Sequence, residues 1–149
     1  MRTRILKTAF SLVVLLTLVA CGSSMNTYKT SGKKPVLLNN STFKIDIYSD
    51  DPTYGYTEKN PIMVGGVSEG PLNERRFLNA LMGPNGEAIT YSRIGSCCHF
   101  KTKNGLSGKA DLLDMYRIAY KGLEKEIVLY INMYDADELK IPVGFKKKE

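Results

Sequence analysis

Two apolar runs decide the fold of this chain: Leu112-Leu113-Asp114-Met115-Tyr116-Arg117-Ile118-Ala119-Tyr120 and Ile127-Val128-Leu129-Tyr130-Ile131-Asn132-Met133-Tyr134. Both are rich in β-branched and aromatic residues, and Lys121-Gly122-Leu123-Glu124-Lys125 lies between them. This arrangement predicts a C-terminal β-hairpin. Alternate residues of the second run are apolar on both faces, which predicts a central strand that is covered on both sides.

Further elements follow from periodicity and from turn residues. Residues 43–48 alternate between apolar and polar side chains, which predicts a half-buried strand, and residues 88–94 are a second strand candidate. Residues 72–82 have helical spacing, start after Pro71 and stop at Gly83-Pro84. Strands therefore dominate. The predicted class is α+β, with a mainly antiparallel sheet, a C-terminal hairpin and one or two helices.

The N-terminus combines a basic stretch, an apolar run and a cysteine. Residues 1–7 carry three basic side chains, residues 9–20 are largely apolar, and Leu18-Val19-Ala20 directly precedes Cys21. The apolar run is too short for a membrane span, which needs about 20 residues. The pattern is typical of a lipoprotein signal peptide over residues 1–20, with cleavage before Cys21 and lipidation of its thiol.

This interpretation divides the chain into three parts. Residues 1–20 are removed, residues 21–34 form the lipidated cysteine and a flexible tether, and residues 35–149 form a single α+β domain. Acyl chains such as palmitate would anchor Cys21 in a membrane. No aspartate follows Cys21, and resemblance to Gram-negative lipoproteins in general then implies the outer membrane of the cell envelope as the destination. Because residues 22–26 contain no acid, we expect the domain to face the periplasm and not the cell surface.

The charge pattern argues against nucleic acid as a partner. Removal of residues 1–20 takes away three of the positive charges behind the formal net charge of +6 and leaves +3. The densest remaining run is Lys146-Lys147-Lys148, which we interpret as a solvated tail rather than a nucleic-acid patch. No cofactor is indicated by any motif.

The residues best suited to chemistry stand together in Cys97-Cys98-His99. These are the two cysteines besides Cys21 and the single histidine of the chain. In an extended segment Cys97 and His99 would point to one side, where an imidazolium would lower the thiol pKa. A disulfide between neighbours is disfavoured, because adjacent Cα atoms lie about 3.8 Å apart and ordinary disulfides need about 4.4–6.8 Å. Buried structural cysteines, a redox site and a metal site all stay open.

A second candidate site is the arginine pair Arg75-Arg76, near the start of the predicted helix. Paired guanidinium groups beside free backbone amides can bind a carboxylate or a phosphate. The alternative is that the two side chains belong to the solvated face of an amphipathic helix.

Five further segments are distinctive as a set: Asn60-Pro61-Ile62-Met63-Val64-Gly65-Gly66, Gly70-Pro71-Leu72-Asn73-Glu74-Arg75-Arg76-Phe77-Leu78-Asn79-Ala80-Leu81, Gly83-Pro84-Asn85-Gly86, Gly95-Ser96-Cys97-Cys98-His99-Phe100-Lys101-Thr102 and Leu129-Tyr130-Ile131-Asn132-Met133-Tyr134-Asp135. With these segments the chain resembles a family of small lipoproteins from Bacteroidota over roughly residues 43–145. Members are sometimes labelled 2-dehydro-3-deoxyphosphooctonate aldolase. That enzyme is a (β/α)8 barrel of about 250 residues. Since 129 residues remain after cleavage, we do not expect this activity.

Two hypotheses from different classes result. The first is a membrane-anchored envelope lipoprotein that acts as a non-catalytic interaction module for an envelope partner. The second is a thiol-redox or metal-binding protein centred on Cys97, Cys98 and His99. The sequence leans away from an enzyme.

Overall fold

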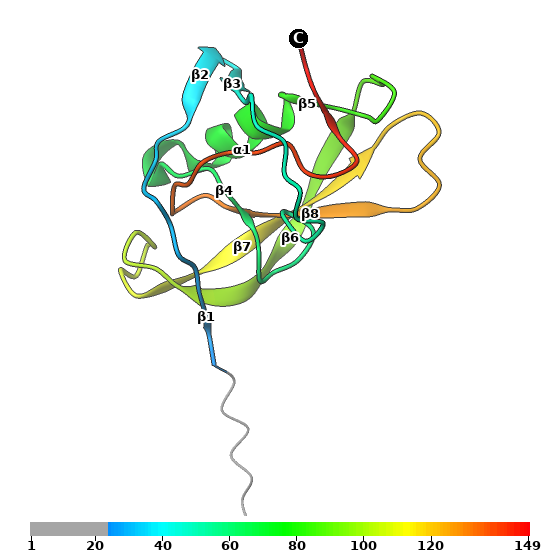
Figure 1. Cartoon of the computed structure of the whole chain (residues 1–149). Helices are drawn as coiled ribbons and strands as arrows, with labels where there is room; N and C mark the ends of the chain where they lie inside the picture. The colour runs from blue at the N-terminus through cyan, green and yellow to red at the C-terminus, as the bar shows by residue number, and fades with distance from the viewer. Residues whose placement is uncertain (1–23) are drawn as a thin grey trace, which may run out of the picture.

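The structure is a computed structural model that describes residues 24–149, so the predicted signal peptide and Cys21 lie outside the described residues. Its main sheet has five strands in the order β1-β6-β7-β8-β4 (Figure 1). The strands are β1 (Asn26–Thr27), β4 (Ile62–Met63), β6 (Thr90–Lys101), β7 (Ala110–Ala119) and β8 (Ile127–Asn132). Pairing is antiparallel from β6 through β8, whereas β1 and β4 run parallel to their neighbours at the two edges.

The predicted fold class is confirmed in its broad form. The described chain is mostly sheet with one α-helix, and its main sheet is mainly antiparallel but mixed. Two smaller sheets pair β2 (Val36–Asn39) with β3 (Thr42–Lys44) and β5 (Leu81–Met82) with β9 (Lys146–Lys147). Within residues 24–149 no helix has the length and apolar character of a membrane span.

The antiparallel pairing predicted from the two apolar runs is present. Strands β7 and β8 pair with Asp114 opposite Ile131 and Ile118 opposite Ile127. Strand β8 lies between β7 and β4, and Leu129 is fully buried. The internal position that two apolar faces indicated for this strand is therefore observed.

Helix α1 (Gly70–Leu78) follows the short 3-10 helix η1 (Val67–Glu69) and ends four residues before the predicted end. It ends early because the chain becomes extended at Leu81, where β5 pairs with β9. The Lys148 amide also donates to the Ala80 carbonyl at 2.8 Å. The run Lys146-Lys147-Lys148, which we expected to be a solvated tail, thus has exposed side chains, but its backbone is paired with the domain.

Two predicted strands have different limits. The strand expected over residues 43–48 ends at Lys44, and Tyr48 makes only an isolated parallel bridge with Ile141. Strand β6 instead continues past residue 94 to Lys101, because β7 offers it a partner over this whole length. The Cys97-Cys98-His99 segment consequently lies within a strand and not after one.

One face of the main sheet packs against helix α1. Phe77 and Leu78 of α1 are fully buried in the same cluster as Leu129 and Ile131 of β8. A second, smaller cluster lies near β1 and contains Phe100, Leu113 and Tyr134, with Tyr28 and Cys98 packed against it. Burial of these side chains is the main stabilising contribution, at about 25 cal/mol for each Å² of apolar surface removed from water.

The segment expected to be a flexible tether is largely fastened to the domain. Asn26 pairs with Phe100 across β1 and β6, and the Ser31 amide donates to Asp137 at 3.2 Å. Lys33 forms an ion pair with Glu138. The described part of the predicted tether is therefore paired with the domain from Asn26 onward. Figure 1 shows β1 at one end of the molecule and β2 at the opposite end.

Candidate functional site

Strand β6 carries a disulfide between two neighbouring residues, Cys97 and Cys98. The pairing with β7 shifts here, because Cys97 lies opposite Leu113 and His99 opposite Leu112. Cys98 is thus the extra residue of a β-bulge, and its φ of 61° is in the left-handed region. We expected the short distance between neighbouring Cα atoms to disfavour this disulfide, and the structure contains it with the Cα atoms 3.7 Å apart. The bond forms at the bulge, where the backbone departs from regular extended geometry.

The surroundings of the two sulfur atoms differ. Cys98 is half-buried and packs against the cluster that contains Phe100 and Tyr134. An oxygen of Glu58 lies 3.5 Å from Cys98 Sγ. Glu58 thus places a carboxylate beside Cys98 Sγ, and within residues 24–149 Cys97 Sγ has no such contact.

His99 does not act with either cysteine in this geometry. Its side chain is exposed, and among residues 24–149 it hydrogen-bonds neither sulfur atom. The sequence placed Cys97 and His99 on one face by simple alternation, which the bulge at Cys98 interrupts. In the part of the chain that the structure describes, no three histidine, cysteine or acidic side chains converge on a point that could hold a metal ion.

The two arginines of the predicted anion site have separate environments. Arg76 is buried and donates to Asn73 at 2.8 Å, to Glu69 at 3.0 Å and to the Asn40 carbonyl at 3.0 Å. It thus connects helix α1 to the turn between β2 and β3. Arg75 is exposed. The pair does not converge on one ligand position.

A buried acidic cluster, which sequence reasoning missed, lies between α1, β6 and β7. Glu74 is fully buried, accepts a hydrogen bond from the Tyr116 hydroxyl at 2.8 Å and has a second oxygen, Oε1, without a partner. The Asp114 carboxylate accepts two hydrogen bonds from the Arg93 guanidinium, at 2.8 and 2.9 Å, and one from the Ser96 hydroxyl at 2.7 Å. Burial raises the pKa of Glu74 to about 7, and the Asp114 charge adds to this effect.

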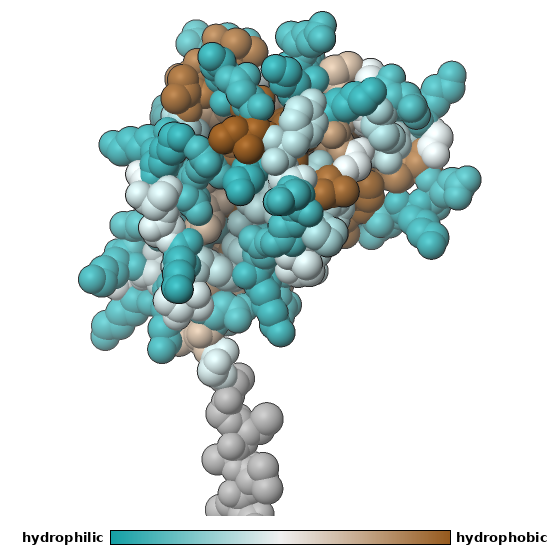
Figure 2. Space-filling view, viewed as in Figure 1, coloured by the Kyte–Doolittle hydropathy of each residue, from teal (hydrophilic) through white to brown (hydrophobic). Residues whose placement is uncertain are grey.

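Strand β2 has three consecutive exposed apolar side chains. Val36, Leu37 and Leu38, which we name the β2 ridge, have exposed fractions of 62, 46 and 53%. Within the described chain β2 pairs with β3 only, so its other edge is free. Figure 2 shows hydrophobic side chains gathered in the upper part of the view, where Figure 1 places β2, and hydrophilic side chains below.

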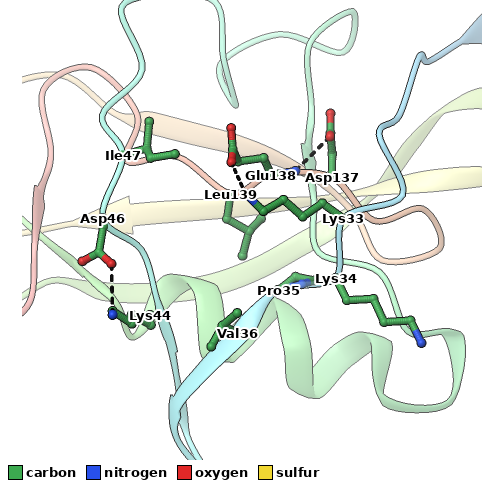
Figure 3. Close-up of a pocket in the computed structure, with 10 residues that line it drawn as sticks. All are labelled: Lys33, Lys34, Pro35, Val36, Lys44, Asp46, Ile47, Asp137, Glu138 and Leu139. Atoms are coloured by element: carbon green, nitrogen blue, oxygen red, sulfur yellow. Dashed lines mark hydrogen bonds and ion pairs between the residues drawn. The ribbon is translucent and has the colours of Figure 1, made fainter.

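Three grooves surround the β2 ridge. The groove beside Val36 has a volume of about 240 Å³, the groove beside Leu37 about 270 Å³ and the groove beside Leu38 about 280 Å³. Figure 3 shows the first groove, where Lys33 pairs with Glu138 and Lys44 with Asp46. Each groove is smaller than the pockets of about 300–1,000 Å³ that usually hold small molecules. Their size suits single side chains of a bound polypeptide.

Comparisons with protein families, with curated proteins and with solved structures found no match to this chain. The mixed five-stranded sheet of residues 24–149 does not have the repeated strand–helix alternation of an aldolase barrel.

Proposed function

We propose that this protein is a membrane-anchored lipoprotein of the cell envelope and that its domain is a non-catalytic interaction module. The observation that carries the proposal is the β2 ridge, an apolar strand with a free edge at the end of the domain opposite β1. An exposed apolar patch next to unpaired backbone groups is a liability unless a partner covers it. The partner is an envelope protein and not a nucleic acid.

The mode of binding that fits this surface is strand addition. A partner strand next to β2 would pair with its free backbone N–H and C=O groups, and alternate side chains of that strand would enter the grooves beside the ridge. Backbone pairing supplies affinity, and the grooves supply selectivity. The volumes of about 240–280 Å³ are of the size needed for individual side chains.

The proposed location and orientation follow from Cys21 and from the positions of β1 and β2 at opposite ends of the domain. Lipidation of Cys21 would anchor the protein in the outer membrane with its domain in the periplasm. Because β1 begins at Asn26, five residues after Cys21, the end of the domain that holds β1 would face the bilayer. The β2 ridge would then point away from the membrane, where an envelope partner can reach it (Figure 1).

The interaction surface is tested by photo-crosslinking in intact cells. We expect a photoreactive amino acid at Leu38 to give one discrete covalent adduct, and the same residue at exposed Glu124, in the loop between β7 and β8, to give none. A Val36→Lys substitution on the same strand should abolish the adduct, since it places a charge in the apolar contact. No adduct at Leu38, or the same adduct at Glu124, would contradict the proposal.

A second candidate function is thiol-redox chemistry, which the accessible Cys97–Cys98 bond favours specifically. A dithiol donor would reduce this bond by two electrons, so that the donor leaves as a disulfide and the protein gains two thiols. The Cα atoms are 3.7 Å apart, below the usual range for a disulfide, and such bonds are more easily reduced.

Intact mass after alkylation tests this candidate. Without reductant we expect no alkylation and a mass lower by two hydrogens than that of the dithiol; after mild reduction we expect two alkyl groups. Two thiols that alkylate without any reductant would rule out the redox function and leave two structural cysteines.

A further inference from the structure

A loop that is rich in lysine lies near β1. Strands β6 and β7 are joined there by residues 102–109, which we name the tip loop (Figure 1). Residues 101–110 contain Lys101, Lys103 and Lys109 and no acidic residue. None of these three lysines forms an ion pair within residues 24–149. The tip loop and its flanking residues therefore carry three lysines that have no ion-pair partner in the described chain, and the neighbouring carboxylates of Asp111 and Asp135 instead accept hydrogen bonds from the loop.

An apolar side chain projects from the middle of the tip loop. Leu106 has an exposed fraction of 82%, the highest among the large hydrophobic residues described. Its backbone is held in place, because the Leu106 amide donates to the Asp111 carboxylate at 2.9 Å and the Gly108 amide to the Gly105 carbonyl at 2.8 Å. The loop thus presents Leu106 to solvent through a fixed conformation.

The tip loop also borders a groove of about 730 Å³ that runs between β1 and the loop. Tyr28, Asp135 and all three lysines are among the residues that line it. Thr102 and Asn104 on the same loop donate to the buried Asp135 at 2.7 and 2.9 Å, which fixes the loop against the sheet. A groove of this size with lysines at its rim can accept an anionic headgroup.

We infer that the tip loop docks on an anionic phospholipid surface and so orients the domain on the membrane. The inference rests on the proposed lipidation of Cys21, because the five residues from Cys21 to Asn26 span at most about 18 Å. The tip loop is then held near the bilayer, where lysines are attracted to anionic lipid and an exposed leucine can enter the interface. Strand β2 lies at the other end of the domain from β1 (Figure 1).

The test uses the mature acylated protein reconstituted on two kinds of vesicle, phosphatidylcholine alone and phosphatidylcholine with phosphatidylglycerol. Flotation reports the anchor, and amide hydrogen exchange at residues 102–109 reports docking. We expect flotation with both vesicles, and slower exchange in the tip loop only on the anionic vesicles. The protection should decrease with added salt, which screens charge over about 8 Å at physiological ionic strength.

Two double variants with the same change of charge test whether the tip loop is responsible for docking on anionic vesicles. Lys103→Gln with Lys109→Gln should lower the ratio of docked to undocked protein by about 25-fold, at roughly fivefold for each lysine. Lys121→Gln with Lys125→Gln makes the same change of charge in the loop at the other end of β7, and it should leave docking unchanged.

The possible failures of the two proposals are distinguishable. Flotation with both vesicles and equal exchange on both would overturn docking while the anchor stands. Flotation with anionic vesicles alone, lost at high salt, would overturn the anchor and support docking by the tip loop. Flotation with neither vesicle would overturn both.

Discussion

A Glu74→Gln substitution should make the protein more stable at pH 8 and leave its stability nearly unchanged at pH 4.5. Glu74 is fully buried, and burial raises its pKa to about 7 from about 4.5. The stability that protonated Glu74 provides is fully present below pH 4.5 and is lost as the pH rises through 7, because the folded protein must then hold an unsolvated charge. Glutamine has the same shape and carries no charge at either pH.

The expected gain at pH 8 is about 3 kcal/mol, since one pKa unit corresponds to about 1.4 kcal/mol. Urea unfolding of residues 22–149 from pH 4.5 to pH 8 measures it. Asp111 and Asp137 have lowered pKa values, so their effect on stability occurs at lower pH. Both residues are present in the wild type and in the variant, so their contributions cancel when the two free energies of unfolding are subtracted. Glu124→Gln, at an exposed position, is the control. Parallel pH profiles for the wild type and Glu74→Gln would contradict this account.

An Asp135→Ala substitution should lower the free energy of unfolding by about 3 kcal/mol. Asp135 is buried and accepts hydrogen bonds from Thr102 at 2.7 Å and from Asn104 and Asn132 at 2.9 Å. Thr102 and Asn132 are themselves buried, so alanine would leave their donors unpaired, at about 1–3 kcal/mol each. Urea unfolding at pH 7 gives the difference.

The conservative variant Asp135→Asn separates hydrogen bonding from packing. Its carbonyl oxygen can still accept from Thr102 and Asn104, while its NH₂ group would face the Asn132 donor. We therefore expect a loss of about 1–2 kcal/mol, smaller than for alanine. Equal losses for Asp135→Ala and Asp135→Asn would contradict the hydrogen-bond explanation. Hydrogen exchange at residues 102–104 should become faster in the alanine variant, because the tip loop loses its fixed contact with the sheet.

The central part of the fold could be predicted because its signals are local. The apolar runs that become β7 and β8 are long, and a short loop joins them, so periodicity alone indicates an antiparallel pair. The short edge strands could not be predicted this way. Strands β1 and β9 have two residues each and exist because a distant segment offers backbone partners, β6 for the first and β5 for the second.

The candidate sites likewise depend on contacts between residues that are distant in the sequence. Clustering in the sequence drew attention to Cys97 and Cys98, but the bulge that lets them bond depends on register with β7. Arg76 looked like part of an anion site, whereas tertiary contacts with Glu69 and Asn40 occupy it. Glu74 had helical spacing and a charge, which is typical of a solvated face. Its burial depends on β7, which is distant in the sequence and whose Tyr116 hydroxyl donates to Glu74.

The central claim is that Cys21 anchors this protein to the envelope membrane, and the intact mass of the protein purified from that membrane tests it most directly. We predict the mass of residues 21–149 plus the mass of the acyl chains, and its disappearance in a Cys21→Ser variant. A mature chain that begins at another residue, or one that begins at Cys21 without acyl mass, would contradict the account.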